Sequence, residues 1–199
     1  MVASLFARRP VRIPRAAGPA LALLALLAAI ALPACAETPA IGAKAPDFTL
    51  ETPEGASVSL HGLLKKGRVV LIVLRGYPGY QCPYCQRQAH DFEVNAGKFA
   101  AKDTQLLLVY PGPAANLGDH AREFLAPYKH LPANYHLVLD PDYRFTLAYG
   151  LRWDAPRETA YPSTFVLNRK GIVTYRKISH VHGDRTTAAE VLDALDNAM

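Results

Sequence analysis

The feature that most constrains the fold is a short, uninterrupted apolar segment, residues 69–74 (VVLIVL), which a cysteine-containing loop separates from an amphipathic segment. Its β-branched residues and its lack of polar positions predict a strand that is buried on both faces. Residues 106–110 (LLLVY) form a second such segment, which Pro111 is expected to end. After the cysteines, apolar residues recur at helical spacing, at Ala89, Phe92, Ala96 and Phe99. The chain is therefore predicted to have an α/β fold, with helices covering the sheet.

The rest of the chain predicts further elements around these two strands. Segments on both sides of Pro53-Glu-Gly55, at 48–50 and 57–60, favour a short N-terminal hairpin. Because strands alternate with helices early in the chain and a second hairpin comes late, we expect a single domain with a mixed sheet. The other expected elements are strands at 135–139, 163–167 and 172–178, and helices at 119–128, 143–149 and after the capping box of Thr187 and Glu190.

The first 36 residues predict an export signal. They hold four arginines and no acidic residue, and they include an uncharged run of 13 residues, 20–32. That run is shorter than the roughly 20 residues that a membrane-spanning helix needs. Ala34-Cys35-Ala36 matches a signal-peptidase pattern, so we expect cleavage after Ala36 and a mature domain of residues 37–199. The neighbouring Leu32-Pro33-Ala34-Cys35 also resembles a lipoprotein signal, which would instead leave a lipid anchor on Cys35.

Charge excludes two classes of partner. Residues 37–199 hold 18 of the 22 basic residues and all 17 acidic ones, a net charge of +1. A body so close to neutral has no net positive charge large enough to attract nucleic acid or an anionic membrane. Both interpretations of the leader place the body outside the cytoplasm, in the periplasm or a similar exported location, where disulfides form.

The two cysteines of the predicted mature body, Cys82 and Cys85, are too close in sequence to staple a domain, so their function is predicted to be chemical. They follow the buried strand and precede the helix that Pro83 is suited to begin. The unpaired N–H groups and the dipole of a helix N-terminus favour a thiolate. Two alternatives stay open: a static disulfide, and a zinc or copper carrier in which His180 or His182, predicted on one face of the last strand, completes the ligand set.

Pro162 stands at the entrance of the predicted strand 163–167, a position typical of a strand-entry proline or of a cis bond in a tight turn. With this element, residues 41–196 resemble the redoxin branch of the thioredoxin fold, the alkyl hydroperoxide reductase/thiol-specific antioxidant (peroxiredoxin-like) family. The resemblance rests on Gly42-Ala-Lys-Ala-Pro46-Asp-Phe48, the strand followed by Cys82-Pro-Tyr-Cys85, Asp140-Pro-Asp142, Ala148-Tyr-Gly150, Pro162-Ser-Thr-Phe165 and Arg169-Lys-Gly171. It implies a thioredoxin fold, with a central mixed sheet flanked by helices and an N-terminal hairpin extension.

The resemblance implies two different nucleophiles. The peroxiredoxin pattern, counted from Pro78, puts Cys82 at a threonine position and Cys85 at the peroxidatic cysteine. The thioredoxin pattern makes Cys82, as the more exposed member, the attacking thiolate and Cys85 the resolving thiol. Two family features are missing: Pro162 stands where peroxiredoxins have an arginine, and the strand 69–74 has no acidic residue. The sequence does not place Arg75 or Arg87 as a substitute for that arginine.

These patterns together predict an exported thiol–disulfide oxidoreductase that cycles a Cys82–Cys85 disulfide. The alternative is a thiol-dependent peroxidase in which Cys85 is peroxidatic and Cys82 resolving. The expected partners are a protein disulfide or a peroxide and a thiol electron donor, without a cofactor, a resident metal or a membrane span. Residues expected to support the site are Pro162, Tyr80, Pro83, Tyr84 and Thr164.

Overall fold

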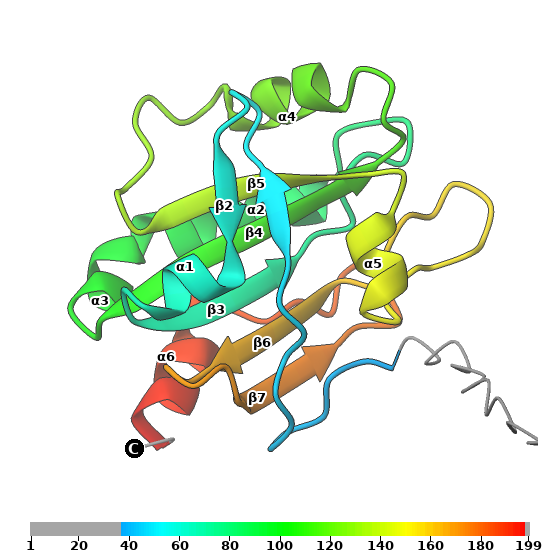
Figure 1. The fold of residues 1–199 in the computed structure, drawn as a ribbon. Coiled ribbons are helices and arrows are strands. Elements are labelled where there is room, and N and C mark those ends of the chain that lie inside the picture. The colour runs from blue at the N-terminus through cyan, green and yellow to red at the C-terminus, as the bar shows by residue number, and fades with distance from the viewer. Residues whose placement is uncertain (1–36, 198–199) are drawn as a thin grey trace, which may run out of the picture. The chain divides into compact units, whose positions relative to one another are not determined.

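A computed structural model describes residues 37–197, so the predicted signal peptide and the lipidation alternative at Cys35 lie outside the described residues. The core of the fold is a five-stranded sheet in the order β5-β4-β3-β6-β7 (Figure 1). β3 pairs in parallel with β4, and β4 with β5, whereas β6 is antiparallel to both β3 and β7. The predicted mixed sheet is confirmed. Its strands are β3 (Arg68–Val73), β4 (Thr104–Gly112), β5 (Tyr135–Pro141), β6 (Ser163–Leu167) and β7 (Val173–Ile178).

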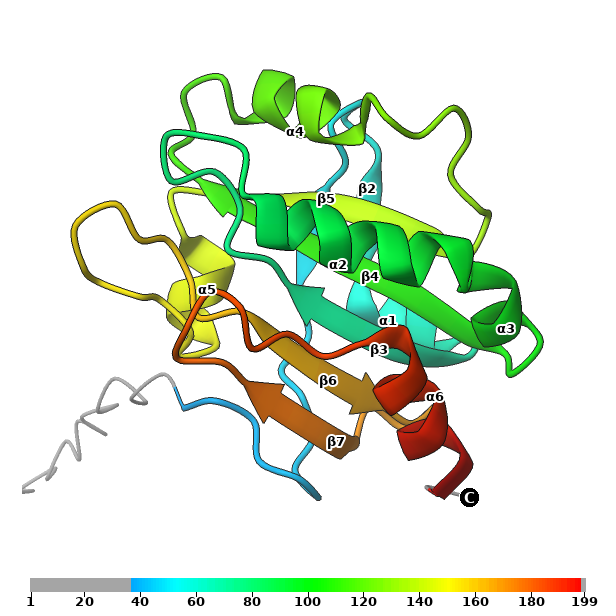
Figure 2. The same cartoon turned by 180° about the vertical axis from the view of Figure 1, so that it is seen from behind.

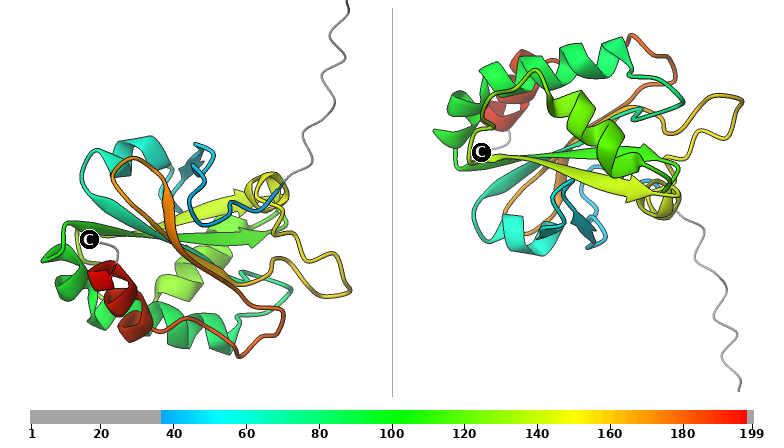
Figure 3. Two further views of the ribbon diagram at one scale, coloured as in Figure 1. Left: turned by 90° about the horizontal axis from the view of Figure 1, so that it is seen from below. Right: turned by 90° about the horizontal axis from the view of Figure 1, so that it is seen from above.

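Helices cover one face of the sheet, and two helices with a hairpin cover the other (Figures 2 and 3). The first layer consists of α2 (Pro83–Val94), α3 (Ala96–Ala100), α4 (Leu117–Leu125) and α6 (Ala188–Asn197). The second consists of α1 (Leu60–Leu64), α5 (Arg144–Ala148) and the antiparallel pair β1 (Thr49–Glu51) and β2 (Ser57–Ser59). The hairpin confirms the predicted N-terminal extension.

β3 joins the two layers because its residues alternate between them. Val70 and Ile72 pack into the core under α2, as does Leu74 directly after the strand, whereas Val69 and Leu71 pack into the core under α1 and α5. All residues from 69 to 74 are fully buried, as the apolar run predicts. The strand that leads to the cysteines is therefore held from both sides of the sheet.

Two of the predicted element boundaries that differ from the structure have a local cause. The helical pattern after Cys85 divides at Asn95, whose side-chain Nδ2 donates to the Asp91 carbonyl at 2.8 Å and so takes an acceptor that the helix backbone would use. β4 continues through Pro111 instead of ending before it. The proline is tolerated because β3 has already ended at Val73, so that β4 has only β5 beside it there.

The end of β7 matches the predicted strand 172–178, but the predicted place of the two histidines does not match the structure. The strand ends at Ile178, so His180 and His182 lie in the loop between β7 and α6, and the prediction that they share a strand face is wrong. Ser179 Oγ donates to the carbonyl of Val181 at 2.5 Å and accepts from the N–H of the same residue at 3.3 Å. This local turn replaces the strand pairing and turns the chain toward α2 and α6.

Gly76 turns the chain between β3 and the cysteines, and its φ of +69° suits glycine. A Cβ at this position would lie 1.9 Å from the Pro111 carbonyl oxygen. We expect Gly76→Ala to lower the free energy of unfolding by roughly 1–3 kcal/mol or more, because both strain and overlap oppose the side chain. Urea denaturation measures the change. Gly97→Ala is the control: its Cβ meets nothing within 4 Å, and alanine favours the α3 helix by about 1 kcal/mol. Equal effects of the two substitutions would contradict this account.

Candidate active site

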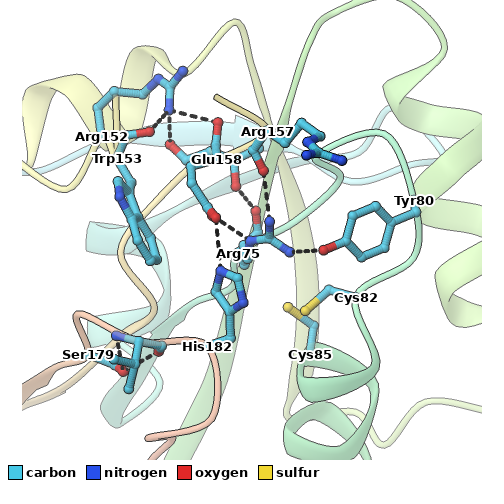
Figure 4. A network of polar contacts seen from close by, with 12 residues as sticks. Arg75, Tyr80, Cys82, Cys85, Arg152, Trp153, Arg157, Glu158, Ser179 and His182 are labelled. Atoms are coloured by element: carbon cyan, nitrogen blue, oxygen red, sulfur yellow. Dashed lines mark hydrogen bonds and ion pairs between the residues drawn. The ribbon is translucent and has the colours of Figure 1, made fainter. Parts of the chain in front are cut away.

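The two cysteines lie at the start of α2, after the loop that leaves β3. Cys82 is the N-cap residue and Pro83 takes the first helical position, as predicted, so Cys85 falls in the first turn. Both thiols are free, and Figure 4 shows the two sulfurs facing one another. Cys82 is 1% exposed and Cys85 is fully buried, so Cys82 is the more exposed of the two, as expected, but only by a small margin. The pair lies in the core under α2, and any charge on it must be balanced there.

The two thiols have pKa values that differ widely. A hydrogen bond from the Cys85 thiol is the main cause that lowers the pKa of Cys82 to about 5. Burial opposes this change, whereas the N–H of Cys85, the charge of Arg185 and the N–H of Tyr84 support it. Burial, and then its role as donor to Cys82, raises the pKa of Cys85 well above the ordinary value of a thiol. The arrangement is a Cys82 thiolate beside a neutral Cys85 thiol.

Arg185 supplies the positive charge at the sulfurs. Its Nη1 lies 3.7 Å from Cys85 Sγ, and its Nη2 lies 4.0 Å from Cys82 Sγ. The side chain comes from the loop between β7 and α6, 100 residues after Cys85. Sequence reasoning missed it, although one signal was present: with proline at position 162, the cation had to come from elsewhere.

The two arginines considered as substitutes lie in other places. Arg75 is buried and forms an ion pair with Glu158 at 2.6 Å. It also donates to the Tyr80 hydroxyl at 2.6 Å, which ties the cysteine loop to the segment before β6 (Figure 4). The guanidinium of Arg87 lies over the Tyr84 ring, 4.6 Å from its centroid. The guanidinium at the sulfurs therefore belongs to Arg185 and to neither of these.

Glu158 extends this network to the loop that carries Arg185. Its second oxygen lies 2.9 Å from His182 Nε2 (Figure 4). Burial opposes ionisation of Glu158, but the hydrogen bonds from Arg75 and His182 outweigh it and lower the pKa of this carboxyl. The His182 carbonyl in turn accepts from Arg185 Nε at 2.7 Å. The cysteine loop, the segment before β6 and the loop after β7 are therefore joined by charged groups.

The predicted support residues lie in two places, beside the cysteines in the chain and at the start of β6. Tyr80 and Tyr84 are 46% and 37% exposed and flank the cysteines in sequence, consistent with the rim of a site. Thr164 is buried in β6, where it pairs with Ile72 of β3. Pro162 directly precedes β6 and its carbonyl accepts from the Ser179 N–H at 2.8 Å. All peptide bonds between residues 37 and 197 are trans, so of the two alternatives given for Pro162 strand entry is confirmed and the cis bond is not.

The structure does not bring together the ligands that the metal-carrier hypothesis needs. His182 is engaged by Glu158, and His180 packs edge-on against the Tyr161 ring, with centroids 4.9 Å apart. In the part of the chain that is described, no three or more histidine, cysteine, aspartate or glutamate side chains converge to hold a metal ion. The predicted set of Cys82, Cys85 and either histidine is therefore contradicted. Over the same residues, none of the helices has the length and apolar character that crossing a bilayer requires.

Comparison with known proteins identifies the family. A model of the AhpC/TSA family matches residues 41–176. The chain belongs to the AhpC/TSA family. The match contains both cysteines and ends before Arg185, so the arginine at the sulfurs lies in the part of the chain beyond the family model.

Relatives and solved structures agree with this assignment. Peroxiredoxin Q, chloroplastic, from rice (Oryza sativa subsp. japonica) is 31% identical over 134 residues, which are 67% of this chain. The aligned part spans 57% of that relative's length, so the chain matches little more than half of it. Peroxidoxin BcpB from Mycobacterium tuberculosis has a TM-score of 0.61 at 22% identity, over 80% of this chain and 96% of that one. A thiol:disulfide interchange protein, DsbE from Chlorobium tepidum, has a TM-score of 0.58 at 25% identity, over 79% and 99%. The predicted thioredoxin fold is confirmed.

The hydrogen bond between the two thiols leads to a titration experiment. Because the Cys82 pKa is about 5, we expect its thiolate absorbance in the reduced protein to rise through a midpoint near pH 5 and to be complete at neutral pH. In Cys85→Ala the midpoint moves upward by about 1–2 pH units, since a hydrogen bond to a charged group contributes about 1.5–3 kcal/mol. Cys85→Ser keeps a donor and is expected to shift less. An identical midpoint in the wild type and Cys85→Ala would contradict the assignment.

Proposed function

We propose that this protein is a thiol–disulfide oxidoreductase in which Cys82 is the nucleophile and Cys85 the resolving thiol. One observation carries the proposal: Cys82 is the N-cap of α2 and its pKa is lowered, whereas the pKa of the fully buried Cys85 in the first turn is raised, so the negative charge resides on Cys82 at neutral pH. A thiolate is the attacking form in disulfide exchange. Cys85, in the first turn of α2, has a raised pKa, so it stays protonated while Cys82 attacks and reacts second. The CxxC spacing allows the two sulfurs to reach bonding distance.

The proposed reaction proceeds in two exchanges. The Cys82 thiolate attacks one sulfur of a substrate disulfide, a mixed disulfide forms, and the first substrate thiolate leaves. Cys85 then loses its proton, which the departing thiolate or solvent accepts, and its thiolate attacks Cys82 Sγ. The Cys82–Cys85 disulfide forms and the second substrate thiolate leaves. The substrate disulfide gains two electrons from the cysteine pair, and a thiol donor returns the pair to its reduced state.

A peroxidase is the second candidate, supported by family membership and by the position of Cys85. Cys85 follows Pro78 at the spacing of the peroxidatic cysteine, and Arg185 Nη1 lies 3.7 Å from its sulfur. In this reaction the Cys85 thiolate cleaves the O–O bond of a peroxide and becomes a sulfenic acid, with release of an alcohol or water. Cys82 then condenses with it, and a disulfide and water form. The raised pKa of Cys85 favours the exchange reaction over this one.

We further propose that the protein acts after export, in the periplasm or an equivalent compartment. The support is the arginine-rich leader with its 13-residue apolar run and the Ala34-Cys35-Ala36 pattern. Mass spectrometry of the protein from fractionated cells tests this proposal. An N-terminus at Glu37 supports cleavage, a lipidated Cys35 supports the anchored alternative, and an intact leader in a cytoplasmic fraction contradicts both.

Trapping each reaction half distinguishes the two cysteine roles. We expect Cys85→Ser to accumulate a mixed disulfide through Cys82 when the reduced variant meets a peptide disulfide, because no thiol remains to resolve it. Cys82→Ser, which keeps Cys85 as the thiol of the pair, is expected to accumulate at least tenfold less, since the thiolate fraction of Cys85 at neutral pH is small. Mass spectrometry identifies the adducts. A mixed disulfide on Cys85 and none on Cys82 would refute the proposed nucleophile.

Hydrogen peroxide separates the two candidate functions. Under the exchange proposal, stopped-flow fluorescence shows the reduced wild type reacting with peroxide at a rate close to that of a free thiolate. A rate several orders of magnitude higher, lost in Cys85→Ser and retained in Cys82→Ser, would establish Cys85 as peroxidatic and the protein as a peroxidase. The same two variants serve in both experiments, so one set of proteins decides between the functions.

A further inference from the structure

The guanidinium of Arg185 is shared between the two sulfurs of the site. Nη1 is directed at Cys85 Sγ at 3.7 Å, and Nη2 of the same group is directed at Cys82 Sγ at 4.0 Å. The two nitrogens of the fork thus each reach a different sulfur. In the described part of the chain, no carboxylate forms an ion pair with this group within 4.0 Å, so its charge is free to act on the thiols.

α2, the helix that carries the cysteines, also holds Arg185 in place. Gln88, one turn after Cys85, accepts from Arg185 Nη1 at 3.3 Å and donates to the Thr186 carbonyl at 3.1 Å. Asp91 accepts from the Ala188 N–H at 2.6 Å. On the other side, the His182 carbonyl accepts from Arg185 Nε at 2.7 Å. Hydrogen bonds therefore hold the Arg185 guanidinium from both sides, so that the packing of the loop on α2 sets its distance to the two sulfurs.

The second exchange poses a problem that this placement solves. When Cys82 forms the mixed disulfide, the negative charge leaves it, and Cys85 must ionise within the core. The strand 69–74 offers no acidic residue to accept the Cys85 proton. A cation fixed beside Cys85 Sγ makes its thiolate easier to form, because an opposite charge within about 4–6 Å lowers a thiol's pKa.

We propose that Arg185 is a catalytic residue that stabilises the Cys82 thiolate before the first exchange and the Cys85 thiolate in the second. This role rests on the proposed disulfide exchange. As the charge passes from one sulfur to the other, the same guanidinium remains beside it and needs no rearrangement. Gln88 is a positioning residue, which acts by holding Nη1 beside Cys85.

Stopped-flow absorbance with 4,4′-dithiodipyridine, an uncharged disulfide, separates the two exchanges. The first equivalent of thiopyridone reports attack by Cys82, and the second reports attack by Cys85. At neutral pH, Arg185→Met is expected to change the first phase by less than about threefold, because Cys82 remains largely ionised. It is expected to slow the second phase by about tenfold or more, the effect of losing a nearby opposite charge. Arg185→Lys, which keeps the charge, restores part of the second phase.

Arg169→Met is the control, because it removes an equal charge from the exposed turn between β6 and β7. Both of its phases are expected to match those of the wild type. Should Arg185→Met fail to fold, Gln88→Met carries the test: it keeps the arginine and removes the acceptor of Nη1, and its second phase is expected to slow by about threefold or more.

The outcomes separate this role from the function on which it rests. A wild type that releases only one equivalent overturns the Cys82–Cys85 exchange and, with it, the role of Arg185. A wild type with two phases, together with a folded Arg185→Met variant whose two phases are unchanged, overturns the role of Arg185 alone. A first phase that slows while the second keeps its wild-type rate limits the residue to Cys82 and overturns the proposed role at Cys85.

Discussion

The hydrogen bond between two buried thiols is the interaction on which the chemistry of this protein depends. An isolated thiolate in the core would be costly, because burial favours the neutral form. Here the Cys85 thiol donates to Cys82, and that bond more than offsets burial. The same bond raises the pKa of Cys85, so each cysteine determines the state of the other. The difference between the pKa values of the two sulfurs therefore arises from their mutual contact and from their burial.

The fold serves this pair by fixing both ends of the segment that carries it. β3 is packed from both sides of the sheet, and the loop after it is tied to β4, where the N–H of Tyr77 donates to the Pro111 carbonyl at 2.9 Å. Arg75 then links that loop to Glu158, in the segment before β6. These contacts leave little freedom between the strand and the first turn of α2. The sulfurs are held in a preorganised geometry, as a reaction between two neighbouring thiols requires.

Local sequence patterns predict much of this fold correctly. The apolar run of β3, the two hairpins, Pro83 at the helix start and the Thr187–Glu190 capping box all appear as expected. These patterns fail where a side chain competes with the backbone: the amide of Asn95 interrupts a helix, and the hydroxyl of Ser179 holds the loop after β7, which carries the two histidines that were expected on a strand face. Such competition depends on one hydrogen bond and leaves no periodic trace.

The sequence by itself determined the class of fold and the two cysteines of the proposed active site, because periodicity, the CxxC spacing and the family motifs are local properties of the chain. Only the tertiary structure decided which cysteine carries the charge and which arginine balances it. Burial, and the approach of Arg185 from 100 residues away, arise when the loop after β7 packs on α2. Neither has a local signature, since electrostatic effects depend on distance in space and not on separation along the chain.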